Sequence, residues 1–191
     1  MIWVVIAIVA VVVVLLALWL VAMFNRLVRL RNRSENAWAQ VDVQLRKRYD
    51  LIPNLVETVK GYAAHERETF EAVTQARAAA QRAQGVAEQA QAENMLTAAL
   101  GRLFAVAEAY PQLRATENFQ QLQAQLSDVE QNIAVARQVY NDTVLSYENA
   151  LETVPTSIIA GMFNFRPREY FQTEDATREA PRVDFGTAPA S

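Results

Sequence analysis

The chain has 191 residues, no Cys, and 18 basic against 21 acidic side chains, so its formal net charge is −3. This length leaves room for one ordinary domain beside a membrane segment, and we expect no second domain. The lack of Cys excludes a disulfide framework and a thiol nucleophile, and the small net charge argues against a nucleic-acid partner. With five Gly, six Pro and no Pro between Pro111 and Pro155, the composition favours an all-α fold with long helices.

The N-terminal segment is an uncharged apolar run from Ile2 to Phe24. A helix of about 20 residues, at a rise of about 1.5 Å per residue, crosses the hydrocarbon core of a bilayer. The alternative is a cleaved signal peptide, which would need a positive n-region and a shorter apolar stretch, whereas only Met1 precedes this run. We therefore predict a transmembrane anchor over residues 1–25 in a single-pass protein, with the lipid bilayer as its first partner.

Basic residues follow the apolar run immediately and do not precede it. They are Arg26, Arg29, Arg31 and Arg33. The positive-inside rule places this side of the anchor in the cytoplasm and the N-terminus outside. The same arginines could hold the helix end against anionic lipid, or they could act only as stop-transfer residues.

Residues 26–153 are expected to form an antiparallel four-helix bundle with long, coiled-coil-like helices. The first helix continues from the anchor and is predicted to end near the basic triplet 46–48, because cations suit a helix C-terminus. Asp50 then resembles an N-cap and Pro53 would occupy the first turn of a second helix, so residues 49–52 are interpreted as a tight reversal. A kinked continuous helix is the alternative.

Apolar periodicity defines the remaining helices. The second is expected to extend past Val73, with the connection to the third in the Ala- and Gln-rich stretch 78–92, and Tyr110-Pro111 should stop the third. The fourth is predicted from Glu117 to Thr153. Its apolar positions alternate spacings of three and four, which is typical of a coiled-coil seam: Phe119, Leu122, Leu126, Val129, Ile133, Ala136 and Tyr140.

The segment 154–171 is apolar and aromatic with interspersed arginines. It could cap the bundle, lie in the membrane interface or dock on a partner, and we favour capping. Its candidate interaction residues are Ile158, Phe163, Phe165 and Phe171. Residues 172–191 lack apolar periodicity and mix both charges with Pro and Thr, so they are expected to form a mobile tail.

No pattern for a catalytic, cofactor-binding or metal site is recognisable, and we expect no cofactor and no small-molecule substrate. The lone His65 lacks a second His four positions on. Polar residues do lie on or beside the predicted seams: Arg48, Glu66, Arg77, Glu130, Arg137 and Asn141. Buried ionised groups must be paired, so we predict an interhelical network that fixes helix register. A carboxylate with a raised pKa, Glu66 or Glu130, is the functional alternative.

Several ordered motifs resemble the LemA family of bacterial membrane proteins. They are the string 48–55 (RYDLIPNL), Lys60-Gly61-Tyr62, Glu66, Tyr110-Pro111-Gln112-Leu113, Asn118-Phe119, Glu130, Ile133, Ala136-Arg137, Tyr140-Asn141, Pro155 and Ile159-Ala160-Gly161. The resemblance covers about Phe24 to Phe171. It implies an N-terminal anchor in the bacterial inner membrane, an antiparallel helical bundle, an N-outside topology and no enzymatic activity.

Relatives in magnetosome-forming bacteria are linked to building intracellular membranes, so the resemblance points to membrane organisation. We therefore expect a membrane-anchored scaffold that contacts other envelope membrane proteins or copies of itself. The alternative is an enzyme or accessory subunit with a site among the interhelical carboxylates.

Overall fold

The computed structural model describes residues 1–172, and within them every regular element is a helix. The helices are α1 (Ile2–Lys60), α2 (Arg67–Arg82), α3 (Val86–Glu108), α4 (Pro111–Arg114), α5 (Glu117–Glu152) and α6 (Thr156–Met162). The all-α prediction is therefore confirmed for the described part of the chain. The predicted tail, apart from Gln172, lies outside the described residues.

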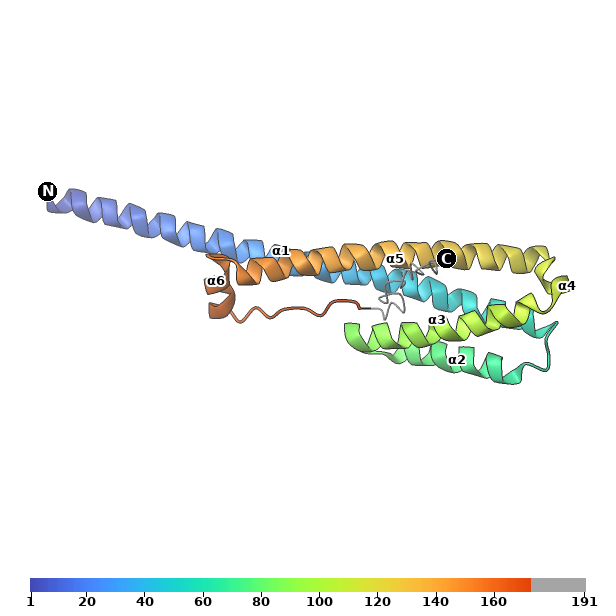
Figure 1. The fold of residues 1–191 in the computed structure, drawn as a ribbon. Coiled ribbons are helices and arrows are strands. Elements are labelled where there is room, and N and C mark those ends of the chain that lie inside the picture. The colour runs from blue at the N-terminus through green and yellow to red at the C-terminus, as the bar shows by residue number, and fades with distance from the viewer. Residues whose placement is uncertain (173–191) are drawn as a thin grey trace, which may run out of the picture.

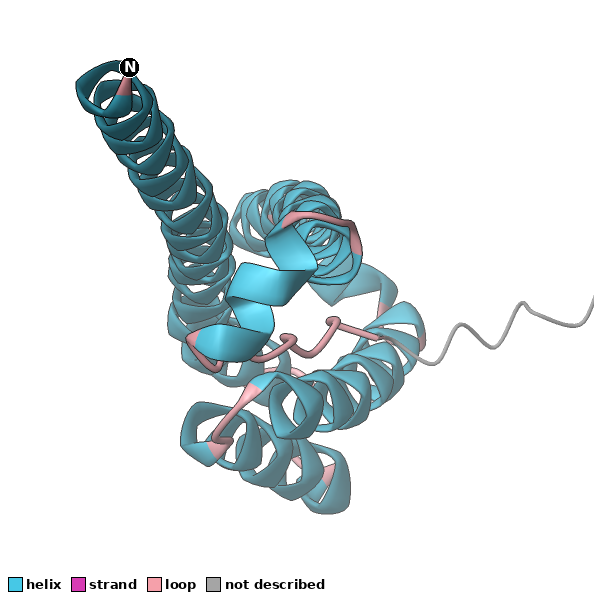
Figure 2. Cartoon of the chain, turned by 90° about the vertical axis from the view of Figure 1, so that its left-hand side faces the viewer, coloured by secondary structure: helices cyan, strands magenta, loops and turns pink. Residues whose placement is uncertain are grey.

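The long helices are arranged in two pairs (Figure 1). α5 lies beside the C-terminal part of α1 and runs back toward the end from which the apolar segment projects. α2 and α3 form a hairpin that packs on the far end of this pair. Figure 2 shows the short α6 in front of the C-terminal end of α5, and α6 contacts both α5 and α1.

The N-terminal part of α1 is long and apolar enough to cross a membrane. An 18-residue window in this helix has a mean hydropathy of 3.5, and none of that window is buried by the rest of the chain. A fully exposed apolar surface of this length needs an apolar solvent, which a bilayer provides. The predicted anchor is thus a candidate transmembrane helix.

α1 does not end where the sequence suggested. The predicted reversal at residues 49–52 is absent, and the helix continues through Pro53 to Lys60. Pro53 has no N–H for the carbonyl of Tyr49, four residues earlier, but Arg77 Nε of α2 donates a hydrogen bond of 2.8 Å to that oxygen. The side chain from α2 thereby replaces the missing backbone bond, and the apolar residues assigned to one second helix are divided between α1 and α2.

The other helix boundaries agree closely with the sequence pattern. α2 and α3 are joined at residues 83–85, where Gly85 takes a φ of 85°, and α3 ends just before Pro111. Thr116 precedes α5, but its hydroxyl donates to the carbonyl of Leu113 at 2.7 Å and does not cap the helix. Of the predicted seam, all positions are buried except Ala136, which is half-buried.

Two hydrophobic cores lie along the molecule. The larger one joins α1, α2, α3 and α5, and it includes Phe171 from the C-terminal segment. The smaller one lies next to the apolar part of α1 and consists of Leu27, Ala150, Ile159 and Ala160. The C-terminal segment therefore contributes to both cores.

Candidate functional site

A polar cluster lies inside the larger core and is built around Arg48. This side chain is only 3% exposed, and its Nη1 lies 2.6 Å from Glu93 Oε2 of α3. Its Nη2 donates to Thr97 Oγ1 at 2.9 Å and lies 2.7 Å from Glu130 Oε1 of α5. One guanidinium group thus connects three helices, because its planar fork can serve several acceptors at once.

Tyr49 and Gln89 complete the cluster on the side of α2. The Tyr49 hydroxyl donates a hydrogen bond to Glu93 Oε1. Gln89 Nε2 lies 2.8 Å from that hydroxyl oxygen, 3.0 Å from Glu93 Oε1 and 3.1 Å from the carbonyl of Ala80. The buried Glu93 carboxylate is therefore surrounded by donors, which is the condition for a stable buried charge.

Burial controls the ionisation of the cluster. Burial raises the pKa of Glu130 above its ordinary value, and the nearby Arg48 opposes this effect. Burial also raises the pKa of Tyr49, and the hydrogen bond to Glu93 adds to the shift, so the phenol stays protonated and acts as a donor. The charges of the cluster are largely satisfied by one another, although Arg48 Nε is buried without a partner among residues 1–172.

Two clefts reach the cluster from outside. One has a volume of about 450 Å³ and is bordered by Arg48, Thr97 and Glu130. The other, of about 510 Å³, is bordered by Tyr49 and Gln89. Water can therefore reach both sides of the cluster, and Glu130 is the carboxylate on the more apolar cleft. No group of His, Cys, Asp or Glu in the described residues is arranged to hold a metal ion.

The predicted polar network is only partly assembled. Arg48 and Glu130 form an ion pair, and Arg77 joins them through the Tyr49 carbonyl. Glu66 is not in the cluster, because the continuation of α1 to Lys60 moves this residue to the start of α2, at the opposite end of that helix from Arg77. Arg137 and Asn141 also do not contact Arg48 directly, and they serve a different part of the chain.

Four members of the cluster were not predicted from the sequence: Tyr49, Gln89, Glu93 and Thr97. A signal for two of them was present, since Gln89 and Glu93 precede Leu96 and Leu100 at spacings of four, three and four. That spacing places both polar side chains on the buried stripe of α3. The Ala- and Gln-rich composition of the region suggested a connection instead and concealed this stripe.

Arg137 and Asn141 hold a segment that we call the C-terminal strap, residues 163–172. Asn141 Oδ1 accepts from the Phe171 N–H at 2.9 Å, and Asn141 Nδ2 donates to the Phe171 carbonyl at 3.2 Å. The Arg137 guanidinium lies 5.5 Å from the centre of the Phe171 ring, a cation–π contact. Tyr140 donates to the Glu169 carbonyl at 2.7 Å. The distal end of the strap is therefore fixed to α5.

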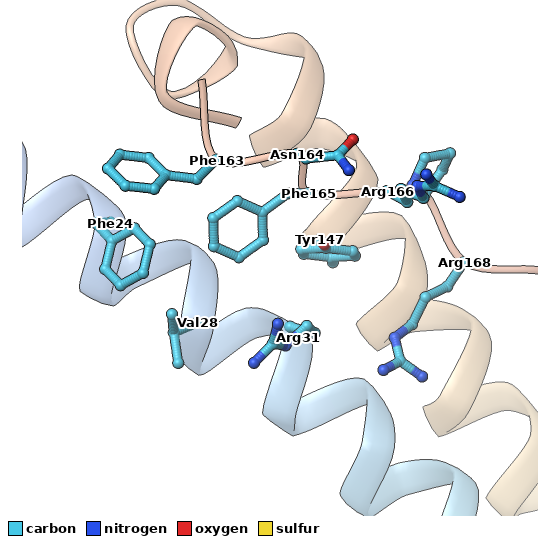
Figure 3. A pocket seen from close by; sticks show the side chains of 10 residues that line it. Phe24, Val28, Arg31, Tyr147, Phe163, Asn164, Phe165, Arg166 and Arg168 are labelled. Carbon is cyan, nitrogen blue, oxygen red and sulfur yellow. The ribbon is translucent and has the colours of Figure 1, made fainter. Parts of the chain in front are cut away.

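The predicted interaction residues are divided by this arrangement. Phe171 is buried, so in this structure it cannot contact a partner, and Phe165 is half-buried. Ile158 and Phe163 are 60% and 58% exposed and remain available. Figure 3 shows Phe163 and Phe165 directed toward Phe24 of α1, whose ring centre lies 4.8 Å and 5.6 Å from theirs.

The membrane-proximal arginines also differ in their surroundings. Arg31 lies over the Phe165 ring, 5.8 Å from its centre, and borders the pocket drawn in Figure 3. All four arginines are exposed, but Arg26, Arg29 and Arg33 do not border this pocket. Only Arg31 among these residues therefore combines a basic group with a concave surface.

Comparison with known proteins identifies relatives that are similar to this chain in sequence. MamQ 2 and MamQ 1, magnetosome proteins of Paramagnetospirillum magneticum, are each 33% identical over 78 residues. MamQ of Magnetospirillum gryphiswaldense is 32% identical over 78 residues. Each match covers 41% of this chain and 29% of the relative, so the chain spans less than a third of the length of these relatives.

The sequence profile of the LemA family matches residues 37–185. This range contains the Arg48 cluster, the Pro53 position with its Arg77 partner and the described part of the C-terminal strap. The match confirms the resemblance found in the motifs, and the chain belongs to the LemA family.

Proposed function

We propose that this protein is a membrane-anchored scaffold or interaction protein of the bacterial cell envelope, without catalytic activity of its own. Residues 1–25 are the anchor in the inner membrane, the N-terminus lies outside, and residues 26–153 act as an antiparallel four-helix bundle in the cytoplasm. The observation that carries this proposal is the continuity of α1. One helix, Ile2–Lys60, is both the apolar segment and a central element of the larger core.

That continuity supports a scaffold because it fixes how the body faces the membrane. A flexible linker would let the body turn freely, whereas an unbroken helix transmits its orientation from the bilayer to every surface of the body. The Arg48 cluster supports the same proposal, since its groups bind one another across α1, α3 and α5 and thereby set helix register. The MamQ relatives, by name magnetosome proteins, make membrane organisation the favoured process.

The topology can be tested because the chain contains no Cys. The exposed positions Ile2 and Ala105 would be replaced, one at a time, by Cys. A maleimide that cannot cross the inner membrane should label I2C but not A105C in spheroplasts, and it should label A105C after lysis. Labelling of A105C in intact spheroplasts would refute the cytoplasmic placement of the body.

Self-association is the partner interaction that α5 supports best. Val135 and Val139 lie four residues apart on this helix, one turn from each other, and are 62% and 43% exposed. Exposed apolar residues on one helical stripe are the usual basis for packing between helices of two copies. Other envelope membrane proteins are the alternative partners for the same stripe.

The scaffold proposal is tested by crosslinking in native membranes. The wild type should form a crosslinked oligomer, and V135E/V139E should lose it. The matched control Q131E/Q138E adds the same charge to exposed positions of the same helix and should keep the oligomer. A wild type that neither crosslinks to itself nor enriches a membrane protein in proximity labelling would refute the scaffold proposal.

A second candidate, an enzyme or accessory subunit, is favoured by one observation. Glu130 has a raised pKa and borders a cleft beside Arg48, as a general acid or base would. Replacement of Glu130 by Gln separates the two proposals. If E130Q loses the protein's function in cells while its oligomer and its thermal stability are unchanged, chemistry at Glu130 is favoured. If E130Q keeps that function, chemistry at Glu130 is contradicted.

A further inference from the structure

The membrane-proximal end of the molecule has a concave basic surface that neither the Arg48 cluster nor the scaffold proposal explains. This pocket has a volume of about 540 Å³ and lies between α1, α5 and the C-terminal strap. Three arginines border it: Arg31 of α1, and Arg166 and Arg168 of the strap. Arg168 is paired with Glu35, but within residues 1–172 neither Arg31 nor Arg166 forms an ion pair. The pocket therefore offers two positive charges that the described residues leave uncompensated.

An apolar cleft continues from the basic pocket. It has a volume of about 240 Å³ and is bordered by Leu20 and Val21 of α1 and by Met162 of α6. Phe24 and Phe163 border both cavities, so the two are neighbours that share a wall. Together they present a cationic compartment joined to an apolar one.

The order of the two compartments along α1 matches the order of a bilayer. Leu20 lies inside the uncharged run, and Arg31 is seven residues beyond its last member, Phe24, which corresponds to about 10 Å of helix. The hydrocarbon core gives way to headgroups within a distance of that order. With α1 in a bilayer, the apolar cleft would therefore lie at acyl-chain depth and Arg31 at headgroup depth.

We propose that this surface is a binding site for one anionic phospholipid. Arg31 and Arg166, which lie apart on the border of the pocket in Figure 3, attract the anionic headgroup, and an acyl chain lies in the cleft between Leu20, Val21 and Met162. The exposed Met162 of α6 faces the surrounding lipid, because it borders the same cleft as Leu20 and Val21 of the apolar run. The proposal requires α1 to lie in a membrane, but it does not depend on the scaffold role or on which side the body faces.

Guanidinium groups suit this ligand. They bind phosphate oxygens through two parallel N–H donors and are only weakly hydrated, so they function well beside apolar surface. A basic group near an anionic membrane contributes about 1 kcal/mol to the free energy of binding. The loss of both arginines therefore corresponds to a fall of about 30-fold in affinity for the lipid, and the loss of one to a fall of about 5-fold. These ratios set the size of the expected effect.

The test uses the full-length protein in mild detergent with equimolar phosphatidylglycerol and phosphatidylcholine, and native mass spectrometry measures the bound lipid. The wild type should retain one phosphatidylglycerol per chain in preference to phosphatidylcholine. R31Q/R166Q should lower this preference by about 30-fold. R26Q/R33Q removes the same charge from exposed positions outside the pocket and should leave the preference unchanged.

Two further measurements distinguish a phospholipid site from a local packing defect and from a site for free phosphate. R166Q alone tests the site without disturbing the contact between Arg31 and Phe165, and it should lower the preference by about 5-fold with unchanged thermal stability. Excess inorganic phosphate, or glycerophosphoglycerol, which has the headgroup without acyl chains, should not displace the lipid. Equal losses in R31Q/R166Q and R26Q/R33Q, no preference in the wild type, or displacement by either soluble phosphate would overturn the proposal.

Discussion

The hydrogen bond between Arg77 and the Tyr49 carbonyl predicts that Arg77 and Pro53 are energetically coupled. Replacement of Arg77 by Met keeps most of the apolar stem but leaves the carbonyl without its donor. An unsatisfied buried acceptor costs about 1–3 kcal/mol. Because Arg77 is half-buried and water can replace part of the bond, we expect R77M to lower the free energy of unfolding by about 1–2 kcal/mol.

The same substitution should matter much less when Pro53 is replaced by Ala. The alanine restores a backbone N–H at this position, which can bond the Tyr49 carbonyl inside α1. P53A alone should be stabilising, since Pro in a helix interior costs up to about 3 kcal/mol relative to Ala. For a chain of this size about 1 kcal/mol corresponds to about 2–4 °C, so R77M should lower the melting temperature by about 2–8 °C in the wild type and by under about 2 °C in P53A.

Thermal unfolding of the full chain in detergent, followed by far-UV circular dichroism, measures this coupling. R82M is the matched control, because Arg82 is an exposed Arg in the last turn of the same helix. It should have a small and equal effect in both backgrounds. If R77M lowers the melting temperature equally in the wild type and in P53A, then Arg77 does not replace the hydrogen bond that Pro53 leaves missing. The continuity of α1 through Pro53 would then have another cause.

Three other predictions concern the cluster and the strap. R48M leaves the buried Glu93 without its ion-pair partner and should lower the free energy of unfolding by about 3–5 kcal/mol. R48M/E93L should recover much of this loss, and thermal unfolding of both variants measures it; additive losses from the two substitutions would contradict the reasoning. The raised pKa of Glu130 means that the folded protein binds this proton more tightly than the unfolded protein does. As the pH rises from 4.5 through the raised pKa, the stability of the wild type should therefore fall relative to that of E130Q, and parallel plots of stability against pH would contradict this. F171A should lower the free energy of unfolding by about 3–5 kcal/mol and expose the distal end of the strap to proteolysis. F163A, at an exposed position, should lower it much less and leave that end protected, and equal effects of the two variants would refute the distinction.

The helices were predictable because their signals are long and local. The apolar run, the spacing along α5 and the stop before Pro111 each depend on one stretch of sequence. The error at residues 49–52 has a different origin. Basic residues, an Asp and a Pro together suggest a helix end, but Arg77, 28 residues from Tyr49, donates the hydrogen bond that Pro53 cannot and so lowers the cost of a Pro inside the helix. A local rule fails where a distant side chain supplies the missing partner.

The polar cluster was half predictable for a similar reason. Arg48 lies on the apolar stripe of α1 and Glu130 lies beside that of α5, so the sequence could predict that Arg48 is buried and Glu130 half-buried. Their main counterpart, Glu93, lies in a region whose Ala-rich composition hides its periodicity, and Tyr49 was interpreted as a turn residue. Glu66 was placed beside them only because the second helix was assumed to begin before Pro53. The one misplaced helix boundary therefore accounts for both the false member and one of the missing ones.

The C-terminal strap gives the continuity of α1 a further consequence. At one end of this segment Phe163 packs on Phe24, next to the apolar part of α1, and at the other end Phe171 is buried in the larger core. Between them Arg168 pairs with Glu35 of α1, and the Glu169 carboxylate accepts from the N–H of Ala87 at the start of α3. The strap therefore connects the region beside the apolar part of α1 to the α2–α3 hairpin by a second route that does not pass along α1. Two connections resist bending and rotation better than one, so the hairpin is held in one orientation relative to the apolar part of α1.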